Sequence, residues 1–238
     1  MRPEPATVLM LPGLLCDAAA WSGVIAALPG IDCRVAGYGR LDAIPAMAAH
    51  VLASVAGSGL RVAGHSMGGR IALEMARQAP ERIDRIALLD TGFQPRPGGE
   101  AGAEEERQRW ALVQLARDQG MRAMGERWAQ GMVHPDHLRT PVFEAILRMI
   151  ERSDPEAFEA QVRALLSRPD ARDVLATLRC PTLLACGRED AWSPLARHQE
   201  MRALAPRSQL VVIEHAGHMA PMEQPGAVAG ALRSWALA

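Results

Sequence analysis

Short runs of apolar and β-branched residues recur along the chain, separated by longer segments with apolar residues at helical spacing. This alternation is typical of βαβ units, in which helices cover both faces of a parallel sheet. Because both faces are buried, such strands are apolar throughout. The predicted strands are Thr7–Leu11, Cys33–Ala36, Leu60–Ala63, Arg85–Leu89, Thr182–Cys186 and Gln209–Ile213. The helices predicted between the first four are Ala18–Leu28, Ile44–Ala56 and Met67–Gln78.

The alternation is interrupted between residues 94 and 178, where no strand-like run is found. Prolines and glycines at 95–99 form a flexible connection, and polar amphipathic helices follow. These helices are predicted at Glu104–Asp118, Met121–Gln130, Pro141–Glu151 and Pro155–Leu166. We therefore expect a doubly wound, mostly parallel sheet of about six strands, built from 1–93 and 179–238. A helical cap is inserted at 94–178.

Composition excludes several classes of protein. The chain has 238 residues and a net charge of -1, so nothing in its charge favours binding to nucleic acid or an anionic membrane. It contains no lysine, which excludes Schiff-base chemistry with a lysine and a P-loop, and no asparagine, which excludes a Cys-His-Asn triad. Its four cysteines lack metal-ligand or disulfide-framework spacing. We expect no metal, no cofactor, and a cytoplasmic protein acting on a small molecule.

The clearest chemical signal is a GxSxG motif, GHSMG at residues 64–68. It follows the predicted strand Leu60–Ala63 and opens the predicted helix Met67–Gln78, which is the context of a nucleophile elbow. The flanking glycines let neighbouring chain approach the turn, and the helix dipole favours negative charge that develops at its N-terminus. Ser66 is therefore the candidate nucleophile.

A serine hydroxyl needs a base before it can attack at neutral pH. His218 is the best placed histidine because it lies on the loop after the predicted strand Gln209–Ile213, from which it can reach the carboxyl edge of the sheet. His215 is the alternative, although it lies nearer to the end of the strand.

The histidine in turn needs a carboxylate that fixes its tautomer. Asp190 follows the predicted strand Thr182–Cys186 and precedes His218, which gives the chain order Ser, Asp, His. Glu189 is its neighbour. Asp90 ends an earlier predicted strand at the same edge and is an alternative.

Acyl transfer also requires donors for the oxyanion of the tetrahedral intermediate. The backbone N–H of Met67, just after the nucleophile, is the first candidate. The loop after the first strand carries Gly13, which permits close approach, and the N–H of Leu14 is the second candidate.

The segments LPGLLCDAAAW, GHSMGG, GREDAWSP and GHMAPMEQP together resemble the α/β-hydrolase superfamily, and in particular its small esterase-like members. Gly217-His218 followed by Glu223 and Pro225 is similar to the GHxxxxExP end of those proteins. The resemblance implies an eight-stranded, mostly parallel sheet and a helical cap over the active site. The sequence departs from this family in two ways. Pro12 stands where a histidine usually precedes the glycine of the oxyanion loop. The first two strands of the family's sheet have no counterpart in the sequence, so we expect about six strands instead of eight.

The insertion and two core loops carry large apolar side chains that are expected to line a substrate pocket. The predicted pocket residues are Leu15, Trp110, Trp128, Met132 and Trp192. Four arginines of the insertion are expected to be solvated surface charges: Arg107, Arg109, Arg122 and Arg127.

The leading hypothesis is a serine hydrolase that cleaves a carboxylic ester, lactone or thioester with water, through an acyl-enzyme on Ser66. Amide or C–C bond hydrolysis could use the same triad. A ligand-binding protein that retains the scaffold of a hydrolase is the alternative from another class.

Overall fold

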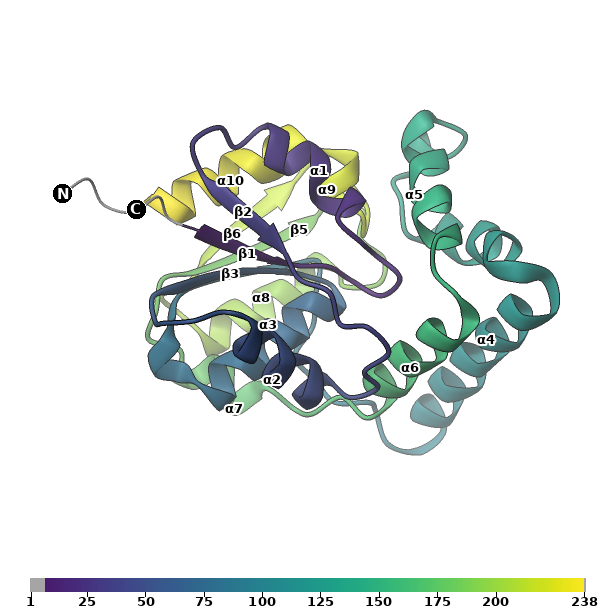
Figure 1. The fold of residues 1–238 in the computed structure, drawn as a ribbon, viewed down its shortest axis with the longest axis horizontal. Coiled ribbons are helices and arrows are strands. Elements are labelled where there is room, and N and C mark those ends of the chain that lie inside the picture. Colours follow the sequence, from purple (N-terminus) through teal and green to yellow (C-terminus); the bar gives the residue numbers. More distant parts are fainter. Residues whose placement is uncertain (1–6, 238) are drawn as a thin grey trace.

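The computed structural model in Figure 1 describes residues 7–237, so residues 1–6 and 238 of the predicted core lie outside the described residues. Six strands form one sheet with the order β2-β1-β3-β4-β5-β6, and all five pairings are parallel. The strands are β1 Thr7–Leu11, β2 Asp32–Val35, β3 Leu60–His65, β4 Ile83–Leu89, β5 Thr182–Gly187 and β6 Gln209–Ile213. The predicted parallel sheet of about six strands is confirmed.

Helices cover both faces of the sheet, as its apolar strands require. In Figure 1, α1, α9 and α10 lie on one face, and α2, α3, α7 and α8 lie on the other. Their bounds are α1 Ala19–Ala26, α2 Ile44–Ser54, α3 Met67–Gln78, α7 Arg172–Thr177, α8 Leu195–Leu204, α9 Ala220–Glu223 and α10 Pro225–Leu237, with a 3-10 turn η1 at Pro80–Arg82. The core between these layers contains fully buried Met10, Trp21 and Ile71.

The remaining helices stand to one side of the sheet in Figure 1. They are α4 Gly99–Trp128, α5 Pro141–Glu151 and α6 Pro155–Leu166, with 3-10 turns η2 Ala129–Gly131 and η3 Pro135–His137. Gly120 interrupts α4 with φ 87° and ψ 164°, so the two helices expected there are the two arms of one kinked element. We refer to the segment from α4 to α6 as the cap. Helix α7 falls within 94–178 but packs on α3 and α8, beside the sheet.

Strand register positions the chemistry. Leu11 pairs with Gly64, and His65 pairs with Leu89, so β1, β3 and β4 end at the same edge. The loops after β5 and β6 leave the sheet at this edge as well. In an open parallel sheet the carboxyl edge is where ligands bind.

Candidate active site

Ser66 occupies a sharp turn between β3 and α3. Its backbone has φ 54° and ψ -116°, a strained conformation for a residue with a side chain. The turn is fixed on both sides, because the Ser66 N–H donates to the Leu89 carbonyl (2.9 Å) and the Ser66 carbonyl accepts from the Thr91 hydroxyl (2.6 Å). The strain is therefore held by the surrounding chain, and it presents the hydroxyl at the start of α3.

The glycines of the motif are needed for space. A Cβ on Gly68 would lie 2.0 Å from the carbonyl oxygen of Leu11, and one on Gly64 would lie 2.3 Å from the carbonyl oxygen of Gly68. Both contacts are with backbone that cannot move aside. The elbow thus packs directly on the end of β1.

Ser66, His218 and Asp190 form a continuous hydrogen-bonded chain. The Ser66 hydroxyl donates to Nε2 of His218 over 2.8 Å, and Nδ1 of His218 donates to Oδ2 of Asp190 over 2.9 Å. The three residues come from three separate loops at one sheet edge. His218 and Asp190 are each only 3% exposed. The structure therefore brings together the three residues proposed from the sequence.

The second oxygen of Asp190 is held by the loop that carries it. Oδ1 accepts the N–H groups of Trp192 and Ser193, each over 2.8 Å. Burial alone would raise the pKa of the Asp190 carboxyl, but the His218 imidazole and these two N–H groups lower it to about 2. Asp190 is therefore an anion at neutral pH, in hydrogen-bond contact with Nδ1 of His218.

The alternative acids, Asp90 and Glu189, and the alternative base, His215, are engaged in other contacts. Oδ1 of Asp90 accepts the Gly187 N–H (2.8 Å), and burial together with the charge of Asp190 raises the pKa of Asp90 well above its usual value. Glu189 accepts the Ala216 N–H (3.1 Å). The ring of His215 packs against His134, with centroids 5.8 Å apart.

His65 contacts the loop that carries His218, which was not expected from the sequence. Its Nε2 donates to the backbone carbonyl of His218 over 2.7 Å, and its ring meets Trp21 edge-on. Burial and the neighbouring His218 lower the pKa of His65 to about 3, so the ring is neutral. His65 therefore supports the loop that carries His218. The GHS sequence alone could have signalled it, as a histidine packed beneath the elbow.

Leu14 and Met67 both line the space in front of Ser66. Met67 is the first residue of α3, so its N–H has no acceptor inside the helix. Within residues 7–237 no acceptor is found for the Leu14 N–H, whereas the next N–H, that of Leu15, donates to Oε1 of Gln161 (2.8 Å). The two N–H groups proposed for the oxyanion are therefore free.

A cavity of about 430 Å³ opens in front of Ser66 between the sheet edge and the cap. Trp128, Met132 and Trp192 line it, whereas Leu15 and Trp110 do not. Leu15 is buried against the cap, where its N–H donates to Gln161. The Trp110 ring is covered by the guanidinium of Arg163, whose Cζ lies 5.1 Å from the centre of the ring.

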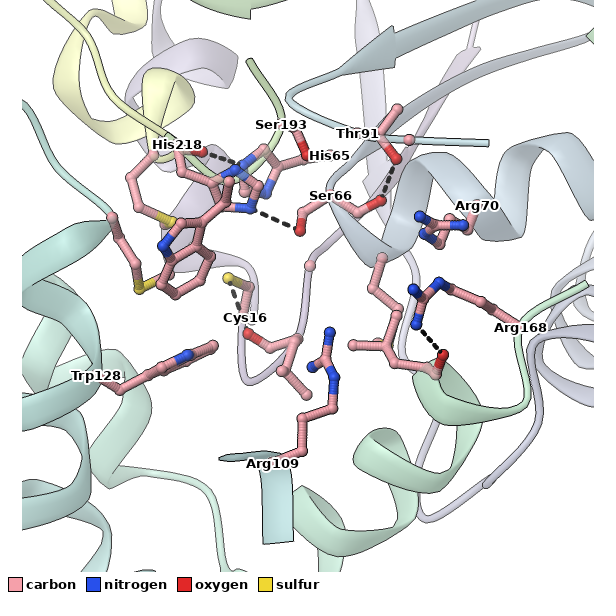
Figure 2. Close-up of a pocket in the computed structure, with 18 of the residues that line it drawn as sticks. Cys16, His65, Ser66, Arg70, Thr91, Arg109, Trp128, Arg168, Ser193 and His218 are labelled. Atoms are coloured by element: carbon pink, nitrogen blue, oxygen red, sulfur yellow. Dashed lines mark hydrogen bonds between the residues drawn. The ribbon is translucent and has the colours of Figure 1, made fainter. Parts of the chain in front are cut away.

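Arg109 differs from its expected place. It lines the cavity, and Figure 2 shows it pointing toward Ser66 from α4. The expectation of a solvated surface charge is wrong for Arg109, because it lies on the face of α4 that is turned to the sheet. Arg107 and Arg122 instead pair with glutamates on the cap surface, and Arg127 is exposed.

Over the described part of the chain, 7–237, no group of three or more His, Cys, Asp or Glu side chains is placed to hold a metal ion. No helix in that part combines the length and apolar character needed to cross a membrane.

Comparison with known proteins points in one direction. The family model described as the alpha/beta hydrolase family matches residues 8–231. The chain is 28% identical over 224 residues to a pimeloyl-[acyl-carrier protein] methyl ester esterase of Nitrosomonas europaea, covering 89% of this chain and 88% of the relative. It superimposes on a malate-bound thermophilic esterase from Thermogutta terrifontis with a TM-score of 0.83 and 29% identity, covering 97% and 89% of the two chains. An enol-lactonase from Burkholderia xenovorans LB400 shares the fold (TM-score 0.83, 20% identity, 100% and 94% covered).

Proposed function

Since the chain belongs to the alpha/beta hydrolase family, we propose that it is a serine hydrolase that cleaves a carboxylic ester, lactone or thioester through an acyl-enzyme on Ser66. The observation that carries the proposal is the pair of hydrogen bonds from Ser66 to His218 and from His218 to Asp190, at 2.8 and 2.9 Å. These distances allow proton transfer without movement of the backbone. The esterases among its relatives support the ester as the bond that is cleaved.

The first half of the reaction forms the acyl-enzyme. Oγ of Ser66 attacks the ester carbonyl while its proton passes to Nε2 of His218. The carbonyl oxygen becomes an oxyanion, which accepts hydrogen bonds from the N–H groups of Leu14 and Met67. His218 then returns its proton to the leaving alcohol, and the C–O bond to the alcohol breaks.

The second half repeats these steps with water. His218 removes a proton from a water molecule, which attacks the acyl carbon on Ser66. The tetrahedral intermediate collapses, the Ser66 hydroxyl regains its proton from His218, and the carboxylic acid leaves. Asp190 stays ionised throughout and stabilises the imidazolium form of His218.

A fluorophosphonate probe tests this proposal. We expect one adduct per chain, located on Ser66 by peptide mass spectrometry, and none on the Ser66→Ala variant. Ser193 also lines the cavity, so Ser193→Ala is the matched control and should still be labelled. An adduct on Ser193 in the wild-type protein would overturn the assignment, and no adduct at all would favour a ligand-binding protein.

The type of bond is tested separately. Nitrophenyl esters, lactones and thioesters of matched acyl groups should be hydrolysed, with the corresponding anilides and C–C substrates slower by orders of magnitude. A faster anilide or C–C substrate would assign the same triad to that chemistry.

We also propose that the protein acts in a reducing compartment such as the cytoplasm. Its four cysteines, Cys16, Cys33, Cys180 and Cys186, are all free thiols in the structure. A chain that worked in an oxidising compartment would more commonly pair them.

A further inference from the structure

The cavity in front of Ser66 is strongly positive, although the chain as a whole carries a net charge of -1. Four arginines line it: Arg70, Arg109, Arg168 and Arg197. Glu105 is the only carboxylate in its lining among the described residues, so the arginines exceed it by three charges. Buried cations are usually paired, which makes this excess unusual.

Glu105 neutralises one part of the cluster. Arg168 donates two parallel hydrogen bonds to its carboxylate (2.7 and 2.8 Å), and Nε of Arg109 donates a third (2.9 Å). Burial would raise the pKa of Glu105, but these partners lower it to about 2, so it is ionised. One carboxylate thus already binds to this wall of the cavity in the geometry typical of arginine.

Arg70 and Arg197 have no such partner. Each donates from Nη1 to one backbone carbonyl over 2.8 Å, Arg70 to Gln94 and Arg197 to Trp192. Within the described residues, no carboxylate forms an ion pair with either of them. Their remaining N–H groups are therefore available to a ligand.

The two guanidinium groups converge on Gly92. A Cβ at this glycine would lie 3.0 Å from Nη2 of Arg70 and 3.5 Å from Nη1 of Arg197. Burial, and then the charges of Arg168, Arg197 and Arg109, lower the pKa of Arg70 to about 9. Holding like charges so close in a buried place is unfavourable until an anion joins them.

We propose that Arg70 and Arg197, with Arg168 and Arg109 beside them, bind a carboxylate on the acyl part of the substrate. The ester cleaved at Ser66 is then the half-ester of a dicarboxylic acid. This inference rests on the proposed hydrolase function. The reaction consumes one half-ester and one water and releases one dicarboxylic acid and one alcohol.

The acyl part is assigned to the arginines by the position of the general acid. His218 must protonate the leaving oxygen, so the alcohol leaves on the side of His218. That side is aromatic, since Trp192 lies 5.1 Å from the His218 ring and Trp128 lies 5.2 Å from Trp192. Figure 2 shows Trp128 on one side of Ser66, with Arg70 and Arg168 on the other.

The two groups lie near the same end of α3. Ser66 is the N-cap residue of this helix, and Arg70 lies in its first turn, about 6 Å farther along the axis at 1.5 Å per residue. Half-esters of succinate, glutarate and adipate differ in the spacing between ester and carboxylate, and together they test which spacing the site accepts.

The test compares each half-ester with a neutral partner of the same shape. Monomethyl succinate is paired with methyl succinamate, and the glutarate and adipate esters are paired with their amides in the same way. We expect the best half-ester to exceed its amide in kcat/KM by about 10- to 100-fold, the value of a charge-assisted hydrogen bond. Raising the salt concentration should reduce the ratio.

Variants are judged by the same ratio, so that a general loss of activity cancels. Arg70→Gln and Arg197→Gln should each lower the ratio of charged to neutral ester toward one. The matched control is Arg107→Gln, which removes an arginine from the cap surface outside the cavity and should leave the ratio as it is. A carboxylate moved to the alcohol, as in 3-acetoxypropionate, should gain little from Arg70.

Two outcomes overturn the inference while the proposed function stands: a ratio near one in the wild-type protein, or a ratio that Arg70→Gln and Arg197→Gln leave unchanged. An equal dependence on Arg70 for 3-acetoxypropionate would overturn the acyl assignment. If no ester is hydrolysed, the proposed function fails and binding decides the inference. Titration calorimetry with monomethyl succinate on Ser66→Ala should then show binding that Arg70→Gln weakens by about 10-fold or more, and no binding would contradict it.

Discussion

The backbone N–H of His218 donates a 2.6 Å hydrogen bond to the carbonyl oxygen of Met132, which directly follows η2 in the cap. The N–H of Met219 reaches the same oxygen at 3.3 Å. Gly217 fits against this segment only because it lacks a side chain, since a Cβ there would lie 2.7 Å from the Met132 oxygen. A cap that swung open as one body at 95–99 would have to break these hydrogen bonds or pull His218 away from Ser66.

Glu223 strengthens this junction, and its removal gives the first prediction. Its buried carboxylate accepts hydrogen bonds from the loop that carries His218, through the N–H groups of Gly217 (3.0 Å) and Met219 (3.1 Å). It also accepts from the cap, through the N–H of His134 (2.7 Å) and Nδ1 of His137 (2.8 Å). Glu223→Gln places an NH2 group against some of these donors. We expect a loss of about 3 kcal/mol in the free energy of unfolding, and a lower kcat.

Urea unfolding and ester kinetics measure both effects of Glu223→Gln. The matched control is Glu214→Gln, which loses an exposed ion pair with Arg188 and should change stability by less than about 0.5 kcal/mol. If Glu223→Gln changed the free energy of unfolding by no more than this control, the carboxylate would not be what joins the cap to the loop.

The second prediction separates the two buried aspartates. Asp190→Asn should lower kcat by about 10³- to 10⁴-fold, because an amide favours the wrong tautomer of His218. Asp90→Asn should keep most of the activity. Among the described residues the Asp90 carboxyl accepts one hydrogen bond, from the Gly187 N–H, and an amide oxygen can still accept it. The reverse ranking of the two variants in kcat would make Asp90 the acid of the triad.

The sheet could be predicted because its strands carry a local signal. Runs such as Thr182–Gly187 are apolar on both faces. This pattern can be read from the run itself, without knowing which strands pair with it. The kink at Gly120 could not be predicted in the same way. Two helical patterns separated by a glycine look the same in sequence whether the glycine bends one helix or belongs to a loop between two. Helix α7 could not be assigned to a layer, since only its packing on α3 places it beside the sheet.

The triad candidates could be named from the sequence because each follows a strand in a set order. The arginine cluster could not be. Arg70, Arg109, Arg168 and Arg197 come from α3, α4, the segment after α6, and α8, and each one alone resembles a surface charge. Their meeting depends on how the cap packs over the sheet, and no local spacing reports that.

The third prediction concerns stability in acid. Burial holds the pKa of folded His65 at about 3, against about 6.5 for a histidine in an unfolded chain. Between about pH 3 and pH 6.5, His65 is protonated in the unfolded chain but neutral in the folded protein. The contribution of His65 is therefore complete above about pH 6.5 and is lost as the pH falls toward 3.

Urea unfolding at pH 7 and pH 4.5 measures this effect. The free energy of unfolding of the wild-type protein should fall more between the two values than that of His65→Gln, by about 2–3 kcal/mol. His50→Gln removes an exposed histidine and should behave as the wild type. Equal losses in His65→Gln and the wild type would mean that His65 is protonated in the folded protein.

The last prediction is that Trp128, on the cap side of the cavity, selects the alcohol. Trp128 lines the cavity on the side of His218 and packs on Trp192, with ring centres 5.2 Å apart, so Trp128→Ala enlarges the space where the alcohol would lie. One methylene contact in an apolar pocket is worth roughly 1–3 kcal/mol, or about 10- to 200-fold in kcat/KM. In Trp128→Ala, kcat/KM for hexyl esters should therefore rise relative to methyl esters by at least about 10-fold. Trp110 lies on the same helix outside the cavity, so Trp110→Ala should scale the whole series without changing its shape. If both variants kept the wild-type profile across methyl, butyl and hexyl esters, the core loop at Trp192 would have to set the length instead.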